Sequence, residues 1–128
     1  MRIRSSQLFI HKDNAKDNQE SNTSSRNWQT KLVLSFTSYG EKFMLFWTVE
    51  GKAMIKENAV IQVIADDTNV INESVIPNMN SGEYVISTGF EFGNLPAGQH
   101  TAKLNYKSLT GKSVSVRNAR LWLIENLI

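Results

Sequence analysis

Apolar and polar side chains alternate along most of the chain that follows residue 27. In residues 28–38, every second position from residue 28 to residue 36 falls on the same side of an extended chain. These positions are Trp28, Thr30, Leu32, Leu34 and Phe36. This period of two predicts a β-strand with those side chains on its buried face. The next segment, residues 42–50, is apolar on both alternations. Such a strand is either central in its sheet, or covered by a second sheet on one side and by a partner subunit on the other.

Short alternating segments separated by turns continue to the end of the chain. They cover residues 59–66, 70–76, 83–92, 100–108 and 113–125, and residues 1–10 form a further candidate, an edge strand. Six of the seven glycines lie at the predicted turns, and no segment predicts a helix of three turns. We therefore predict an all-β fold, an antiparallel β-sandwich that forms a jelly roll of about eight strands.

The last predicted strand changes phase once. Val114 and Val116 share one face, but Ala119 and Leu121 take the alternate positions after Asn118. A shift of one residue inside a strand indicates a β-bulge, so we predict a bulge at this point.

Residues 11–27 are polar apart from Ala15. A segment of this composition adds little to a core. We predict a single jelly-roll domain over residues 1–128, in which residues 11–27 form an extended polar loop or arm that can contact a neighbouring subunit.

Composition narrows the class of protein. The chain has 128 residues, the size of one domain, and its 41% hydrophobic and 20% charged residues argue against a mainly disordered chain. The absence of cysteine excludes disulfides, thiolate metal sites and a cysteine nucleophile. The net charge of +2 is no strong basic bias, so nucleic-acid binding is not expected. No apolar run approaches the length of a membrane span, so no membrane partner is expected.

The small net charge is the sum over three segments of the chain whose net charges differ in sign. Residues 1–40 carry six basic and three acidic side chains, residues 41–94 carry three and eight, and residues 95–128 carry five and one. If the fold gathers these blocks into surface patches, a basic face of one copy can meet an acidic face of the next. Such a contact would set the register of an oligomer.

The two histidines, His11 and His100, have no catalytic partner at a recognisable spacing. His100 shares a face with Leu104 and Tyr106, which favours a histidine at the rim of the core or inside it. The tripeptide 111–113, Gly-Lys-Ser, lacks the remaining spacing of a phosphate-binding loop. We predict no catalytic residue and a protein that is not an enzyme.

An acidic turn is the one candidate for a metal site. It contains Asp66, Asp67, Asn69 and Glu73. These side chains offer oxygen ligands for Ca²⁺, but the turn lacks the ligand spacing and the glycine of a calcium loop. A solvated turn is therefore the expected interpretation, and we predict no metal-binding residue and no cofactor.

Candidate interface residues are apolar or basic side chains that the predicted strands leave outside the core. Leu121 and Leu123 take the core face of the last strand, so Trp122 points away from the core unless another segment covers it. An outward tryptophan beside an arginine is typical of an interface anchor, and apolar residues at the end of the chain also need cover. The candidates are Trp122, Arg120, Arg117, Phe46, Leu127 and Ile128.

Residues 93–125 resemble the C-terminal half of small jelly-roll proteins from the virions of tailed bacteriophages. The matching positions are Leu95, Ala97, Gly98, His100, Thr101, Lys103, Leu104 and Tyr106, followed by Arg117, Asn118, Ala119, Arg120 and Leu121. Similar strands occur in tumour-necrosis-factor-like trimers and in carbohydrate-binding modules. The resemblance therefore bears on the fold more than on the role.

The resemblance implies a non-enzymatic structural component of a tailed-phage virion, in the first place an oligomeric capsid decoration or stabilising protein. The expected partners are further copies of the chain in a homotrimer, and the major capsid protein or other virion proteins. The expected location is the virion, assembled in the host bacterial cytoplasm. The alternative is a receptor- or carbohydrate-binding module of a tail fibre or head fibre, with a host-surface glycan as its partner.

Overall fold

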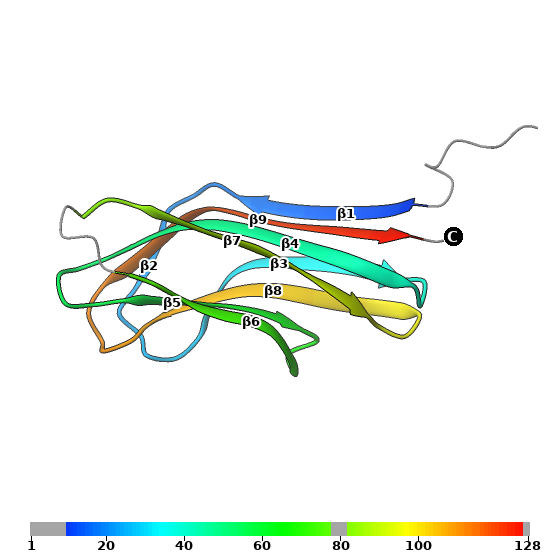
Figure 1. Cartoon of the computed structure of the whole chain (residues 1–128). Coiled ribbons are helices and arrows are strands. Elements are labelled where there is room, and N and C mark those ends of the chain that lie inside the picture. Colours follow the sequence, from blue (N-terminus) through cyan, green and yellow to red (C-terminus); the bar gives the residue numbers. More distant parts are fainter. Residues whose placement is uncertain (1–9, 78–81, 127–128) are drawn as a thin grey trace, which may run out of the picture.

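Nine β-strands follow one another in residues 10–77 and 82–126, the part of the chain that the computed structural model describes (Figure 1). They are β1 (Ile10–Asp17), β2 (Ser21–Thr23), β3 (Gln29–Ser38), β4 (Lys42–Ala53), β5 (Ala59–Ala65), β6 (Asn69–Ile76), β7 (Val85–Asn94), β8 (Gly98–Ser108) and β9 (Val114–Asn126). These residues contain no helix. The predicted edge strand in residues 1–10 falls, except for its last residue, outside the described residues.

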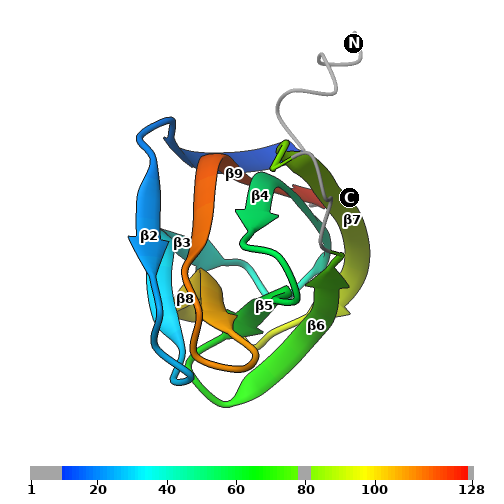
Figure 2. The ribbon, with the colours of Figure 1, turned by 90° about the vertical axis from the view of Figure 1, so that its left-hand side faces the viewer.

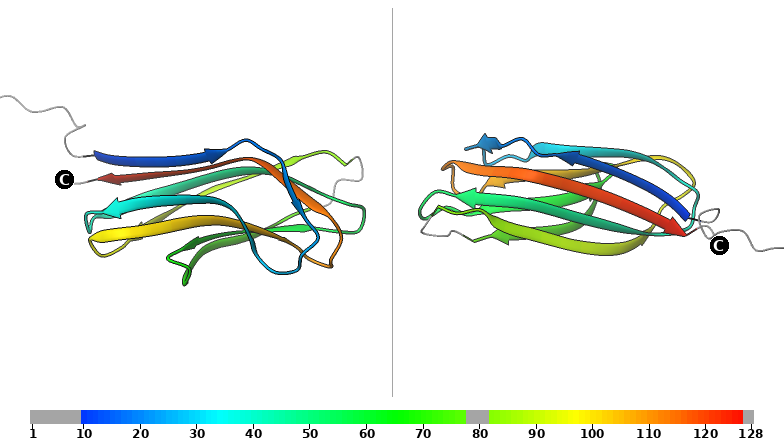
Figure 3. Two further views of the ribbon diagram at one scale, coloured as in Figure 1. Left: turned by 180° about the vertical axis from the view of Figure 1, so that it is seen from behind. Right: turned by 90° about the horizontal axis from the view of Figure 1, so that it is seen from above.

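The strands form two antiparallel sheets that pack face to face. Sheet A has the order β1-β9-β4-β7, with β2 beside the first residues of β9, and sheet B has the order β3-β8-β5-β6. Figure 2 looks along the strands and shows sheet A above sheet B, and the right panel of Figure 3 shows sheet A from above. Consecutive strands such as β3 and β4 lie in different sheets. This arrangement confirms the predicted jelly-roll sandwich.

The core lies between the sheets and consists of alternate side chains from both. Val49, Leu104 and Leu121 are completely buried there, and Leu34 and Phe36 belong to the same cluster, as the alternation of β3 predicts. Removal of this apolar surface from water is the main stabilising contribution to the fold.

A β-bulge interrupts β9 at Asn118, where the sequence predicts it. Thr48 of β4 pairs with Arg120 of β9. The next pair, Glu50 with Arg117, follows after one intervening residue on β4 but two on β9. Asn118 has a φ of +52°, a left-handed conformation that asparagine adopts more readily than most residues. The bulge redirects the side chains on either side of it.

The prediction of a loop in residues 11–27 is wrong for the residues that form β1 and β2. The backbone of β1 pairs with β9 over its whole length, from Ile10 opposite Asn126 to Asp17 opposite Ala119. Ala15 packs against the core. The pairing uses backbone N–H and C=O groups, and the polarity of the side chains gives no information about it.

Lys31 joins this polar edge to sheet B. The register of β3 against β8 shifts between Thr30 and Leu32, and the Lys31 side chain is only 1% exposed, although the alternation predicts an outward position. Its ammonium group has three partners, at 2.5 Å, 2.8 Å and 3.1 Å: the Gln19 carbonyl, the Ser21 hydroxyl and the Asp17 carboxylate. A buried charge requires such partners, so Lys31 holds the connection between β1 and β2 against β3.

Candidate functional site

The outer face of sheet A is apolar over two neighbouring rows of side chains. In the first row, Met44 of β4 lies between Ile124 of β9 and Phe92 of β7. In the second row, Phe46 lies between Trp122 and Phe90. Their strand neighbours Leu45, Leu121 and Leu123 are buried in the core, so these rows face away from it. We call this surface the aromatic face: Met44, Phe46, Phe90, Phe92, Trp122 and Ile124.

The aromatic face is accessible to solvent. Phe92 is 60% exposed, Phe90 54% and Trp122 37%. The ring centroids of Phe90 lie 6.0 Å from Phe46 and 5.9 Å from Phe92. The solvent side of an antiparallel sheet is usually polar, and a contiguous exposed apolar surface marks an interaction site.

Two glycines determine which face of β7 points outward. A Cβ atom placed on Gly89 would lie 2.5 Å from the Trp47 ring, and one placed on Gly93 would lie 2.6 Å from the Phe43 ring. The two rings from β4 thus occupy the space that side chains of β7 would need inside the sandwich. The glycines must face inward, and the aromatic side chains of β7 face outward as a result.

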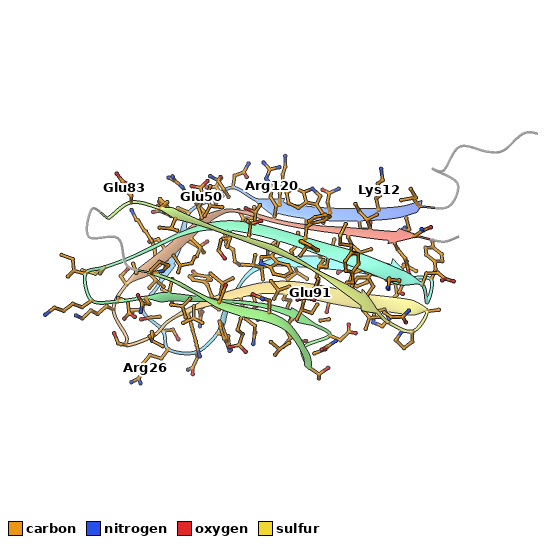
Figure 4. The ribbon with its side chains drawn as sticks, in the orientation of Figure 1. Lys12, Arg26, Glu50, Glu83, Glu91 and Arg120 are labelled. Carbon is orange, nitrogen blue, oxygen red and sulfur yellow. The ribbon has the colours of Figure 1, made fainter. Side chains whose placement is uncertain are left out.

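Basic side chains border the aromatic face. Lys12 on β1 lies opposite Ile124, and Lys16 lies opposite Arg120. Figure 4 shows Lys12 and Arg120 on this side of the sandwich. On the same face, the ammonium group of Lys42 lies 5.7 Å from the centroid of the Phe92 ring, and an open depression of about 330 Å³ adjoins that ring.

The predicted interface residues are only partly brought together. Trp122 and Phe46 belong to the aromatic face, and Arg120 borders it. Arg117 lies on the other side of the bulge in β9. Leu127 and Ile128 lie outside the described residues. The sequence prediction missed Met44, Phe90, Phe92 and Ile124, because alternation separates two faces of a strand without showing which one is outside. Gly89 and Gly93 mark the inward face of β7, but the sequence alone does not show that they face inward.

A second group of side chains surrounds Arg117 on the same side of sheet A. The Arg117 Nε donates a hydrogen bond of 2.8 Å to Glu50, and the Asn118 amide donates one of 2.9 Å to the other oxygen of the same carboxylate. The guanidinium carbon lies 3.7 Å from the centroid of the Tyr84 ring, and the Tyr84 hydroxyl donates a hydrogen bond to Glu20. We call this group the arginine cluster: Glu20, Glu50, Tyr84, Arg117 and Asn118.

The arginine cluster has a defined charge state at neutral pH. Hydrogen bonds from Asn118 and Arg117 lower the pKa of Glu50, so its carboxylate is ionised. Burial and the hydrogen bond to Glu20 raise the pKa of Tyr84 to about 12, so its hydroxyl remains a donor. Glu50 therefore holds the guanidinium at its Nε, and the Tyr84 ring covers one face of the guanidinium. Neither Glu50 nor Tyr84 titrates near neutrality.

Two buried glutamates organise the turns at opposite ends of the sandwich. Glu57, in the turn between β4 and β5, is 1% exposed, and Glu125 at the end of β9 is completely buried. Glu125 accepts hydrogen bonds from the Ser38 hydroxyl and from the backbone N–H groups of Tyr39 and Glu41, and so fixes the turn between β3 and β4. Neither carboxylate was singled out from the sequence.

Glu57 fixes the turn between β8 and β9. Its carboxylate accepts hydrogen bonds from six donor groups: the backbone N–H groups of Asn58, Leu109, Thr110 and Lys112, and the hydroxyls of Ser108 and Thr110. Burial alone would raise the pKa of Glu57, but these hydrogen bonds outweigh it and lower the pKa to about 2. Both buried glutamates therefore have a structural role.

His100 links the turn between β5 and β6 to the loop before β8. Its Nδ1 lies 2.7 Å from the Asp66 carboxylate, and its Nε2 lies 2.7 Å from the Pro96 carbonyl. The other Asp66 oxygen accepts a hydrogen bond from the N–H of Thr101, and the imidazole lies beside the Phe36 ring at the edge of the core. Both ring nitrogens face acceptors, so the doubly protonated imidazolium is the favoured form.

We expect the stability that His100 contributes to fall as the pH rises above 6.5. The Asp66 carboxylate and then the Pro96 carbonyl raise the folded-state pKa of His100 above 6.5. The stabilisation is therefore complete below pH 6.5 and is lost as the pH rises through the folded-state pKa. Thermal unfolding of the wild type and of His100→Gln between pH 5 and pH 9 measures this, with the variant less stable at low pH by on the order of 1 kcal/mol. An equal pH dependence in both proteins would contradict it.

The acidic turn between β5 and β6 is engaged in contacts of its own. Asp66 binds His100, and Asp67 lies 2.8 Å from the Lys103 ammonium. Within residues 10–77 and 82–126, no three side chains of His, Asp or Glu are grouped as metal ligands. The same residues contain no helix of the length and apolarity that would cross a membrane.

Comparisons with known proteins support the fold and no more. No family model and no curated protein matches the chain. A structure of Eiger TNF from S. frugiperda is similar, with a TM-score of 0.54 and 7% identity over 91% of this chain and 92% of the other. The VP2 protein of infectious bursal disease virus has a TM-score of 0.54 and 10% identity over 91% of this chain and 31% of the other. The C-terminal domain of EclA, a sugar-binding protein, has a TM-score of 0.52 and 13% identity over 81% of this chain and 77% of the other.

The similar structures include long proteins of which this chain spans only 13% or 19%. The roles of the similar proteins differ widely. Sequence identities between 7% and 13% do not show that this chain shares any of these roles. Together with the strand order, the comparisons show that the chain has a jelly-roll β-sandwich fold.

Proposed function

We propose that the protein is a non-enzymatic assembly module that associates with further copies of itself, as a trimer, through the aromatic face of sheet A. As an oligomer it serves as a decoration or stabilising component of a tailed-phage virion. The observation that carries the proposal is the aromatic face, because two rows of apolar side chains are accessible to solvent in the isolated chain.

The distribution of charge supports contact between different edges of neighbouring copies. Pairing of β1 with β9 brings basic side chains of the first and last charge blocks together, among them Lys12, Lys16 and Arg120. Two exposed acidic side chains, Glu83 and Glu91, lie before and within β7 at the other edge of sheet A. A contact between the two unlike edges, repeated by rotation about an axis along the strands, closes a ring. The resemblance to tumour-necrosis-factor-like trimers supports three copies.

The virion role is supported by the resemblance of residues 93–125 to small jelly-roll proteins of tailed phages. Its test is fractionation of the phage particles whose genome encodes this chain, after mild dissociation. We expect the protein to remain with intact capsids, in numbers that are a multiple of three per site. Its presence with tails alone would contradict capsid decoration, and its absence from all particle fractions would contradict the virion role.

A receptor- or carbohydrate-binding module is the second candidate, favoured by one feature of sheet B. Trp28, which the alternation wrongly places in the core, lies on the outer face with the Lys107 ammonium 4.4 Å from its centroid. Beside them Asn105 donates a hydrogen bond of 3.0 Å to Gln62, while its buried carbonyl oxygen has no partner in the described residues. Aromatic rings and amides together suit sugar hydroxyls. Binding on a glycan array that Trp28→Ala abolishes would favour this candidate.

A further inference from the structure

Three exposed apolar side chains lie at one end of the sandwich. Met54 and Ile55, in the turn between β4 and β5, are 58% and 64% exposed, and Leu109, in the turn between β8 and β9, is 46% exposed. Figure 2 looks at this end of the molecule and shows both turns in front. We call this surface the apolar tip: Met54, Ile55 and Leu109. It lies outside the aromatic face, and it is a second exposed apolar surface that needs a partner.

Hydrogen bonds fix the two turns to each other. The backbone N–H of Met54 donates a hydrogen bond of 3.2 Å to the Ser113 carbonyl, and the N–H of Leu109 donates one of 3.2 Å to the Asn58 carbonyl. The buried carboxylate of Glu57, in the first turn, accepts further hydrogen bonds from backbone N–H groups of the second turn. The backbone of the apolar tip therefore has one shape before a partner binds, so less conformational entropy is lost on binding.

Basic side chains border the apolar tip. Lys56, in the turn between β4 and β5, and Lys112, in the turn between β8 and β9, are both exposed. Arg26 is exposed in the connection between β2 and β3, which is hydrogen-bonded to the end of β8. Figure 4 shows Arg26 at this end of the sandwich, and it shows the carboxylate of Glu83 at the same end but on the side of sheet A. The border of the apolar tip is therefore mainly basic.

The partner that suits this surface is a protein with an apolar pocket bordered by carboxylates. An apolar centre with a polar border is the usual composition of a protein interface. Basic side chains in the border favour an acidic partner. The fixed shape of the two turns favours a protein over a lipid bilayer, because a fluid bilayer has no pocket of fixed shape that the turns could match.

We propose that the apolar tip and its basic border bind an acidic protein surface of the phage particle, an inference that rests on the assembly and the virion role proposed above. Rotation about an axis along the strands leaves the same end of every copy on the same side of the ring. All three copies therefore direct their apolar tips the same way, and one ring contacts three equivalent sites at once. Linked binding of this kind is stronger than the binding of a single tip.

The test is rebinding of the purified protein to phage particles from which it has been released, measured by co-sedimentation at low and high salt. Ile55→Asp is expected to weaken binding at least about tenfold. Lys112→Glu is expected to weaken it about tenfold at low ionic strength and less at high salt. Val75→Asp is the matched control, because it places the same charge at a position on β6 that is 54% exposed, and it should bind like the wild type.

The outcomes separate this inference from the proposed function. If Ile55→Asp has the wild-type oligomeric mass and binds particles as well as Val75→Asp does, the apolar tip is not the contact and the assembly stands. If the wild type binds no particles, the virion role is wrong and this inference falls with it. Wild-type binding to vesicles of phosphatidylcholine and phosphatidylglycerol in equal parts, lost in Ile55→Asp, would contradict a protein partner. Unfolding curves of all variants show whether the fold is retained.

Discussion

Glu57→Gln is expected to lower the free energy of unfolding by about 3 kcal/mol at neutral pH, the largest loss we expect from a change of one functional group. The Glu57 carboxylate satisfies six donors around the turn between β8 and β9. A fall in pKa from 4.5 to about 2 on folding corresponds to a contribution of this size. The glutamine amide would also turn its NH₂ group toward backbone N–H groups, which leaves buried donors without acceptors.

The pH dependence of stability provides an independent check on Glu57. Its pKa is lower in the folded protein, so its contribution is present above pH 4.5 and is lost as the pH falls toward 2. Wild type and Glu57→Gln should therefore differ in urea unfolding at pH 7 and approach each other in acid. Glu73→Gln removes an exposed carboxylate and should match the wild type within about 0.5 kcal/mol. If Glu57→Gln also lowered the free energy of unfolding by no more than about 0.5 kcal/mol, the Glu57 carboxylate would not hold the turn.

Phe90→Asp is expected to convert the assembled protein to monomers. The Phe90 ring lies in the second row of the aromatic face and is 54% exposed in the isolated chain, so the substitution spares the core. In the assembly, however, it would bury a carboxylate among apolar side chains. We expect the association constant to fall at least about 100-fold, or about 2.7 kcal/mol, measured by light scattering coupled to size-exclusion chromatography.

Val33→Asp is the control for this loss of assembly. Val33 is 44% exposed on β3, on the outer face of sheet B, and the change is of the same kind. It should leave the oligomeric mass unchanged. Equal loss of mass in both variants would show that sheet A has no special part in association, and retention of the wild-type mass by Phe90→Asp would exclude the aromatic face as the contact surface.

The sequence predicted those features of the fold that side-chain periodicity encodes. Alternation and turn residues were sufficient for the jelly roll, and the change of phase around Asn118 located the bulge. Periodicity did not reveal β1, because an edge strand is held by backbone hydrogen bonds and its own side chains are polar. It also misplaced Trp28 and Lys31, because a shift in register between β3 and β8 reverses the faces of β3 at this point.

The candidate site was predicted only in part for a related reason. Trp122 could be placed outside because Leu121 and Leu123 required the core. Phe90 and Phe92 could not, because only the positions of the Trp47 and Phe43 rings show that the glycines of β7 face inward. Long-range partners were also hidden. Nothing in the sequence shows that Glu57 meets the turn more than 50 positions further along the chain.

Sedimentation equilibrium of the unmodified protein tests the assembly through sheet A most directly. The chain has a mass of 14.5 kDa, and we expect the measured mass to rise with concentration to three times this value, with Phe90→Asp remaining at the mass of one chain. A wild-type mass of 14.5 kDa at every concentration, with the aromatic face left open to solvent, would contradict the account.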